Sequence, residues 1–280
     1  MFEMHARVKA FLRLSRIEHG VMSGLAVIAG ALSTQVFVAD KAVLAALSAF
    51  FAETSLFAFN DVFNVEEDKV NNPTRPIVAG EISLREALLF AIATGIMSVV
   101  FASAIGPFPL AVIALALGLG ILYDAMLKRH GFLGNLIVAG LTAFTFPFGA
   151  IAVTASPTEK SLLFFAVAFL ANVGREIVKG IRDLEGDMKA GICTLPCEVG
   201  EKPAGVIAAA FMSLAVVLSF SGLAFVSLKH LYLALILVTD VIFAYSAAVM
   251  ALKADRHHAE VARRITLPAM LLAIVAFTLP

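Results

Sequence analysis

Nine long apolar stretches recur along the chain, separated by short polar breaks. A helix that crosses a membrane needs about 20 predominantly apolar residues, and each stretch is close to that length. The pattern predicts an all-α integral membrane protein with nine transmembrane helices, forming a single domain over residues 1–280. The expected spans are 17–38, 42–63, 84–105, 108–127, 132–153, 160–183, 204–227, 231–252 and 265–279.

The composition supports a membrane protein. Of the 280 residues, 60% are hydrophobic and only 15% are charged, and the mean hydropathy is +0.94. Soluble domains are about 45–50% apolar and about 25% charged. The composition therefore excludes a disordered chain, a nucleic-acid-binding protein and an ordinary cytosolic enzyme, and we expect the chain to be surrounded by lipid.

The 21 basic and 21 acidic residues cancel in number, but the basic residues are distributed unevenly along the chain. If the N-terminus is cytoplasmic and the spans alternate, all but three of the 21 Lys and Arg fall on the inner side, the exceptions being Lys41, Lys160 and Lys229. Loops on the cytoplasmic side carry an excess of Lys and Arg. We therefore expect a multi-pass protein of the cell membrane, with its C-terminus outside.

A first polar stripe follows the second expected span. Asn60, Asn64 and Asp68 recur at intervals of four, and Asp61 lies three residues before Asn64. On a continuous helix these side chains share one face. The stripe is therefore expected to meet the membrane surface on the cytoplasmic side.

A second stripe ends the sixth expected span. It consists of Asn172, Glu176, Lys179, Asp183 and Asp187. Because the two stripes lie four spans apart, we expect two related four-helix halves plus one helix, with both stripes facing a central cavity.

The two stripes together predict a magnesium–diphosphate site. Polar groups in membrane helices are costly unless they are paired or functional, and carboxylate and amide oxygens without His or Cys suit Mg²⁺. Neighbouring Lys and Arg are suited to phosphate. The expected metal ligands are Asn60, Asp61, Asn64, Asp68, Asp183 and Asp187. The expected diphosphate-binding residues are Lys69, Arg75, Lys128, Lys179 and Arg182.

At these residues the sequence resembles the UbiA superfamily of intramembrane prenyltransferases. The motif N-D-x-x-D-x-x-x-D is present from Asn60 to Asp68 with Asn64 at its third position, and D-x-x-x-D is intact from Asp183 to Asp187. The segment from Tyr123 to Lys128 resembles the family's Y-x-x-x-x-K. The resemblance implies nine helices around a cavity, Mg²⁺ as cofactor, and transfer of a prenyl group from an allylic diphosphate to an acceptor.

The longer strings at 60–77, 127–135 and 175–196 resemble the archaeal ether-lipid branch of that superfamily. That branch transfers geranylgeranyl to the hydroxyl of geranylgeranylglyceryl phosphate. The implied partners are a prenyl diphosphate donor and a lipid-like acceptor, and no pattern indicates a protein partner. The expected catalytic residues are Asp68, Asp183, Asp187 and Tyr123.

Two further roles are expected inside the membrane. Either Tyr123 or Asp124 takes the proton of the attacking hydroxyl, or Tyr123 contacts phosphate. Phenylalanine faces are candidates to shelter the cationic prenyl fragment through cation–π attraction. Those phenylalanines are Phe57, Phe59, Phe144, Phe146 and Phe148.

Three other functions fit part of the pattern. A UbiA-type enzyme can prenylate an aromatic acceptor such as 4-hydroxybenzoate or make haem O, but His19 stands where many aromatic-acceptor members have Asn. A secondary transporter is expected to have ionisable residues near the bilayer midplane, whereas the two stripes of this sequence lie at the cytoplasmic ends of their spans. A CDP-alcohol phosphotransferase would carry a longer D-G-x-x-A-R pattern, which this sequence lacks.

Three remaining polar or reactive residues are expected to be structural. Cys193 and Cys197 cannot form a disulfide framework and lack the partners of a zinc site, so we expect plain thiols. Asp240 lies in the middle of the eighth expected span, where a hydrogen bond to a neighbouring helix would satisfy it.

Overall fold

The structure is a computed structural model that describes residues 2–129 and 131–280; His130, in the polar break after the fourth expected span, lies outside this range. The described residues form helices joined by short connections, with no strand among them. In chain order the elements are α1 (Phe2–Ser15), α2 (Ile17–Leu32), α3 (Ala39–Phe63), α4 (Val65–Asn71), α5 (Leu84–Ile105), α6 (Pro107–Ala125), η1 (Leu127–Arg129), α7 (Gly131–Ala143), α8 (Thr145–Thr154), α9 (Glu159–Lys189), α10 (Leu195–Val199), α11 (Glu201–Ser219), η2 (Phe220–Ala224), α12 (Lys229–Leu252) and α13 (Arg256–Phe277).

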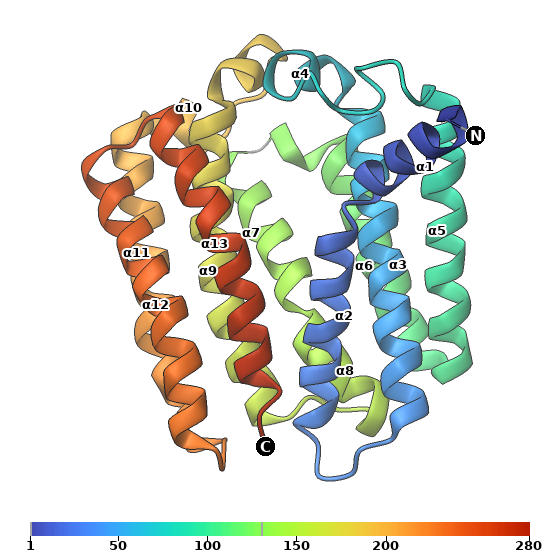
Figure 1. The fold of residues 1–280 in the computed structure, drawn as a ribbon, viewed down its shortest axis with the longest axis vertical. Helices are drawn as coiled ribbons and strands as arrows, with labels where there is room; N and C mark the ends of the chain where they lie inside the picture. Colours follow the sequence, from blue (N-terminus) through green and yellow to red (C-terminus); the bar gives the residue numbers. More distant parts are fainter. Residues whose placement is uncertain (1, 130) are drawn as a thin grey trace.

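The long helices run side by side in one bundle, and the short helices α4 and α10 lie at one end of it (Figure 1). The N-terminus and α1 lie toward the same end, and the C-terminus lies at the other (Figure 1). We call the end that carries α4, η1 and α10 the polar end. The ends of α3 and α9, which carry the two polar stripes, are at this end (Figure 1).

The expected membrane character is confirmed. Within the described residues, six helices are long and apolar enough to cross a membrane: α3, α5, α6, α9, α11 with η2, and α12. The fifth expected span is broken into α7 and α8, which meet at an angle of 41°. If this bent pair counts as one span, these helices give seven spans. The apolar helix α2 has only 16 residues, and the count of nine spans stays a prediction.

The two polar stripes have different backbones. Helix α9 begins at a capping box of Thr158 and Ser161 and continues for 31 residues, so its stripe stays on one face. Helix α3 instead ends at Phe63, and α4 begins after Asn64. The first stripe was expected to lie on a single helix; the break at Asn64 turns its last member, Asp68, onto a separate short helix.

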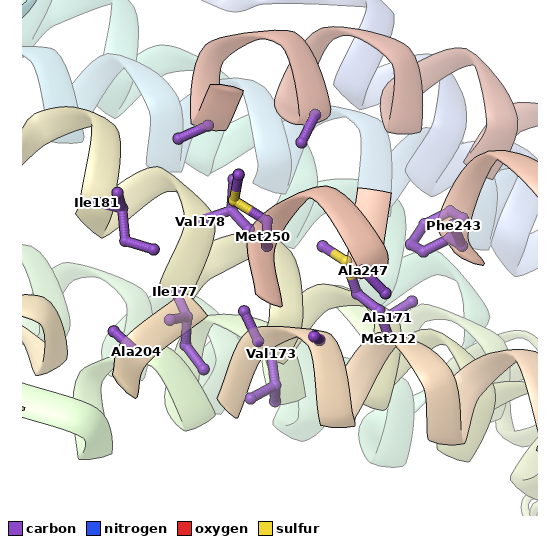
Figure 2. Close-up of a cluster of buried hydrophobic side chains, with 14 of the residues drawn as sticks. Ala171, Val173, Ile177, Val178, Ile181, Ala204, Met212, Phe243, Ala247 and Met250 are labelled. Carbon is purple, nitrogen blue, oxygen red and sulfur yellow. The ribbon is translucent and has the colours of Figure 1, made fainter. Parts of the chain in front are cut away.

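The face of α9 opposite its polar stripe makes the largest apolar cluster. Val173, Ile177 and Ile181 are almost fully buried against Met212 of α11 and Met250 of α12 (Figure 2). In a membrane, helices associate mainly through close packing because the surrounding lipid is as apolar as the side chains. Packing against α11 and α12 therefore holds α9 in place with its polar face directed inward.

Helices α2 and α8 approach each other backbone to backbone. A Cβ added at Gly149 would overlap the carbonyl of Val27, and one added at Gly30 would overlap the carbonyl of Phe146. Small residues at such crossings allow helices to pack closely in membranes. The close approach brings Phe146 and Phe148 of α8 into the wall of a cavity of about 310 Å³ between the helices.

We expect Gly149→Ala to lower the free energy of unfolding by about 1–3 kcal/mol through overpacking. Gly118→Ala is the matched control, because a Cβ there has no neighbour within 4 Å and Ala is the better helix former. Thermal unfolding of the purified protein in detergent measures both. Equal melting temperatures for the two variants would contradict the close helix contact.

Candidate active site

Two adjacent cavities lie between the helices. The larger, about 310 Å³, is lined mostly by apolar side chains from both sides of the bundle, and we call it the apolar cavity. The smaller, about 60 Å³, lies at the polar end and is lined mostly by polar side chains; we call it the polar cavity. Several residues line both, among them Asn60, Tyr123 and Lys179. A ligand with a charged head and an apolar tail therefore fits across their junction.

Five of the six expected metal ligands line the polar cavity. The α3 helix carries Asn60, the break after it is Asn64, and α4 carries Asp68. The other two, Asp183 and Asp187, lie on α9. The approach of α4 to α9 depends on Gly186, because a Cβ at that position would overlap the side chain of Asn71. The structure thus brings the two stripes to one cavity.

The sixth expected ligand, Asp61, does not line either cavity. Its side chain is fully buried, and its Oδ1 accepts a hydrogen bond from Arg16 at 2.5 Å. Its Oδ2 lies 3.6 Å from Nη1 of Arg75. Asp61 therefore holds two cations at the edge of the site.

Lys69 also lies apart from the cavity. It pairs with Glu66 at 2.6 Å on the surface, where its side chain is 54% exposed. The other four expected diphosphate-binding residues, Arg75, Lys128, Lys179 and Arg182, all line the polar cavity.

Arg16 lines both cavities, a position that the spacing of the motifs did not indicate. It is the residue between α1 and α2 and has a left-handed backbone, with φ of 43°, which is uncommon for a residue other than Gly. Its guanidinium lies 4.2 Å from the ring centre of Phe57. The ion pair with Asp61 and this cation–π contact compensate the cost of that conformation.

The cations around the polar cavity each have an acidic partner. Arg182 donates two hydrogen bonds to Asp183, at 2.6 and 2.5 Å. Lys128 forms an ion pair with Glu67 of α4. These pairs allow the charged groups to be buried. They also keep each cation beside the cavity, where a bound phosphate can replace its carboxylate partner.

Asp68 and Asp187 are less fully paired. Asp68 accepts a hydrogen bond from Asn72 at 2.9 Å and lies 4.0 Å from Nε of Arg75. Burial raises the pKa of the Asp68 carboxyl above its usual range, against the opposing effect of Arg75. Burial also lowers the pKa of the Arg75 guanidinium. Asp187 accepts a hydrogen bond from Asn71 at 3.3 Å.

Four buried amide or hydroxyl atoms of residues that line the polar cavity make no hydrogen bond within the described part of the chain. Groups of this kind cost free energy unless a partner satisfies them, so their concentration here indicates a polar ligand. Asn71, Asn135 and Thr194 were not expected from spacing alone, although all three lie within the strings that resemble the ether-lipid branch. The atoms are Asn64 Nδ2, Asn71 Oδ1, Asn135 Nδ2 and Thr194 Oγ1.

The donor set fits Mg²⁺ bound together with a diphosphate. Among the described residues, no group of three or more His, Cys, Asp or Glu is close enough to hold a metal ion by itself. Mg²⁺ usually takes one or two protein carboxylates and completes its shell with water and phosphate oxygens. Asp68 and Asp187, with the amide oxygens of Asn60 and Asn64, are hard oxygen donors of the kind that such an ion prefers.

The apolar cavity is lined by Phe57, Phe144, Phe146 and Phe148, as expected. Phe59 is not in its wall; it stacks on Phe63, with ring centres 6.2 Å apart.

Tyr123 lies at the junction of the two cavities. Its neighbour Asp124 accepts a hydrogen bond from Asn60 at 2.6 Å. Asp240 accepts a hydrogen bond from Ser219 of the neighbouring helix at 2.8 Å, which confirms its expected structural contact.

The expectation of free thiols was wrong. Cys193 and Cys197 form a disulfide, with Cα atoms 5.2 Å apart. Cys193 lies just before the N-cap Thr194, and the first turn of α10 brings Cys197 back beside it. Two cysteines are too few for a framework, but this separation of the Cα atoms suits a single disulfide. The disulfide encloses Thr194, which lines the polar cavity.

Comparisons with known proteins identify the family of the chain. The model of the UbiA prenyltransferase family matches residues 21–275. A digeranylgeranylglyceryl phosphate synthase from Archaeoglobus fulgidus is 41% identical over 277 residues, which cover 96% of this chain and 94% of the relative.

Solved structures share the fold. One, described as giving structural and mechanistic insights into digeranylgeranylglyceryl phosphate synthase in membranes, has a TM-score of 0.72 and 29% identity, covering 97% of each chain. A UbiA homologue from Archaeoglobus fulgidus, solved with GPP and Mg²⁺, has a TM-score of 0.65 and 19% identity, covering 96% of this chain and 100% of that one.

The contacts of Asp61 and Lys69 predict that the two residues contribute very differently to the stability of the folded protein. Asp61→Asn removes the charge that compensates two partly buried arginines and should lower the free energy of unfolding by about 3 kcal/mol. Lys69→Ala breaks only an exposed ion pair and should change it by less than about 1 kcal/mol. Thermal unfolding in detergent compares the two. A stable Asp61→Asn protein would contradict the role assigned to this carboxylate.

Proposed function

The chain belongs to the UbiA prenyltransferase family, and on this basis we propose that it transfers a geranylgeranyl group from its diphosphate to the hydroxyl of geranylgeranylglyceryl phosphate, in ether-lipid synthesis. One observation carries the proposal: a polar cavity lined by acids, amides and cations adjoins a larger apolar cavity and shares lining residues with it. The relative that is 41% identical is named a synthase of digeranylgeranylglyceryl phosphate, the product that this reaction would form.

We further propose that nine spans form the bundle, in two four-helix halves plus one helix. Helices α2 and α13 would complete the set, with α7 and α8 as one broken span. The polar end, with the N-terminus, would be cytoplasmic, because it carries most of the Lys and Arg and such residues accumulate on that side.

In this proposal the donor's diphosphate lies in the polar cavity. Asp68 and Asp187, with Asn60 and Asn64, would hold Mg²⁺ on it. When bound, the ion would neutralise the diphosphate and stabilise it as a leaving group. Asp183 lines the same cavity, but it is already doubly hydrogen-bonded by Arg182, so we propose that it positions that arginine.

The cations would act directly on the leaving group. Lys128, Arg75, Lys179 and Arg182 line the polar cavity and would donate hydrogen bonds to the phosphate oxygens as the C–O bond breaks. Fixed donors aimed at developing charge are among the strongest contributions to catalysis. Glu67, now paired with Lys128, would give way to the diphosphate.

The apolar cavity would hold the isoprenoid chains and exclude water from the cationic prenyl carbon. Its phenylalanine rings can stabilise that carbon by cation–π attraction, worth about 0.5–2 kcal/mol for each well-placed ring. Tyr123 lines both cavities, and its neighbour Asp124 lines the apolar cavity. We propose that one of these two side chains takes the proton of the acceptor hydroxyl.

A screen of acceptors tests the proposal. The purified protein receives radiolabelled geranylgeranyl diphosphate and Mg²⁺ with geranylgeranylglyceryl phosphate, 4-hydroxybenzoate or a naphthoate. We expect prenylated product only with the glyceryl phosphate. Product only with an aromatic acid would contradict the ether-lipid assignment, and no product with any pair would contradict the transferase assignment for this chain.

The polar cavity has its own test. Asp68→Asn and Asp187→Asn should each reduce kcat by about a hundredfold or more, because charge stabilisation of the leaving group is lost. Chelation by EDTA should abolish turnover of the unaltered protein, and added Mg²⁺ should restore it. Glu66→Gln is the control, since Glu66 lies on the surface with its side chain 78% exposed. Full activity in both aspartate variants would overturn the assignment.

A further inference from the structure

A second group of cations lines the apolar cavity, apart from the diphosphate site. It consists of Arg175 of α9 and Arg263 of α13. Neither residue lines the polar cavity. Lys179 lies between this pair and the polar cavity and lines both cavities. Helices α9 and α13 pack against each other (Figure 1), so the two arginines come together from elements far apart in the sequence.

Arg175 differs from the other arginines of the site. Its Nε donates to Thr266 Oγ1 at 3.0 Å and its Nη1 contacts the Met270 sulfur at 2.8 Å. Among the described residues, no carboxylate lies within ion-pair distance of it, whereas Arg16 pairs with Asp61 and Arg182 with Asp183. A guanidinium in an apolar wall without an acid is costly. It therefore indicates that an anion completes its contacts.

The acids nearby do not balance this side of the cavity. Glu260 is shared among Arg182, Arg263 and Arg264. The side chain of Arg263 remains 34% exposed and lines the cavity. Arg175 of α9 contacts Thr266, which lies about one helical turn after Arg263 on α13, so these cations share one region. Glu176, which lines both cavities, pairs with Lys179 at 3.4 Å. Neither Glu176 nor Glu260 forms an ion pair with Arg175, so the region keeps an excess of positive charge.

The position along α9 separates this region from the donor. Arg175 precedes Asp183 by eight residues, which is about 12 Å along the helix axis. Two phosphate groups of like charge require separate sites, and a glyceryl phosphate keeps its hydroxyl within a few bonds of its phosphate. Lys179 lies between the two regions, about one helical turn from Arg175.

We propose that Arg175 and Arg263 bind the phosphate of the acceptor. The inference rests on the proposed function, because it assumes a phosphorylated prenyl glyceryl acceptor. It assigns the choice of acceptor to a cation pair on α9 and α13 that the diphosphate site does not use. An acceptor without a phosphate would leave Arg175 unpaired and is rejected for that reason.

Kinetics with two acceptors test the site. The purified full chain receives geranylgeranyl diphosphate with either geranylgeranylglyceryl phosphate or the same ether alcohol without phosphate. In Arg263→Gln and Arg175→Gln, KM for the phosphorylated acceptor should rise about tenfold or more, as expected for a lost charged hydrogen bond. KM for the donor should stay within about twofold, and the preference for the phosphorylated acceptor should fall by the same factor of about ten or more.

Two control variants sharpen the result. Arg264→Gln removes a neighbouring cation that also pairs with Glu260 but is 73% exposed and lines neither cavity, so it should behave as the unaltered protein. Arg175→Lys keeps the positive charge and should recover part of the preference, which a purely structural role would not produce. Unchanged discrimination in both Gln variants would overturn the inference.

Thermal unfolding without donor separates this inference from the function itself. A ligand that binds only the folded state raises the melting temperature. The phosphorylated acceptor should raise the melting temperature of the unaltered protein more than the alcohol does, and this difference should disappear in Arg263→Gln. Absence of transfer by the unaltered protein would contradict the proposed function alone. Equal shifts from the two acceptors, or a phosphate-dependent shift retained in Arg263→Gln, would contradict the acceptor-phosphate site.

Discussion

The burial of charge in an apolar bundle is the constraint on which the rest of this structure depends. A charged group away from water requires a partner, and breaking such a pair is more costly than never having made it. Asp61, between Arg16 and Arg75, connects the start of α2, the end of α3 and the loop after α4. The polar end is held together by such pairs, and the same cations border the cavity in which a diphosphate would lie.

Helix α9 joins the two kinds of interaction that this fold needs. One face packs through aliphatic side chains against α11 and α12 (Figure 2). The other face carries acids, amides and cations along both cavities. Because the apolar face fixes the rotation of the helix, the polar face cannot turn toward lipid. The placement of the site is therefore a consequence of packing on the far side of α9.

The spacing of residues along the chain predicted some parts of the site correctly and missed others. Asp183 and Asp187 lie on an uninterrupted helix, so their spacing correctly predicted a shared face. Asp61 and Lys69 have the same side-chain types as their neighbours, but Asp61, on α3, faces two arginines instead of the cavity. Lys69 follows the break after Phe63 and lies on the surface of α4. Spacing along one helix does not reveal such a break. The Cys193–Cys197 bond was missed for the same reason, since it depends on where α10 begins.

The membrane-spanning helical class, the two polar stripes and the hard oxygen donors beside cations can be predicted from the amino-acid sequence. These properties follow from hydropathy and side-chain type, which are read residue by residue. The packing of the helices sets which cations face which acids, which of the polar residues line a cavity, and that Arg175 contacts Thr266 rather than a carboxylate. Those outcomes depend on contacts between helices distant in the chain, and the balance of buried charge is decided by such contacts.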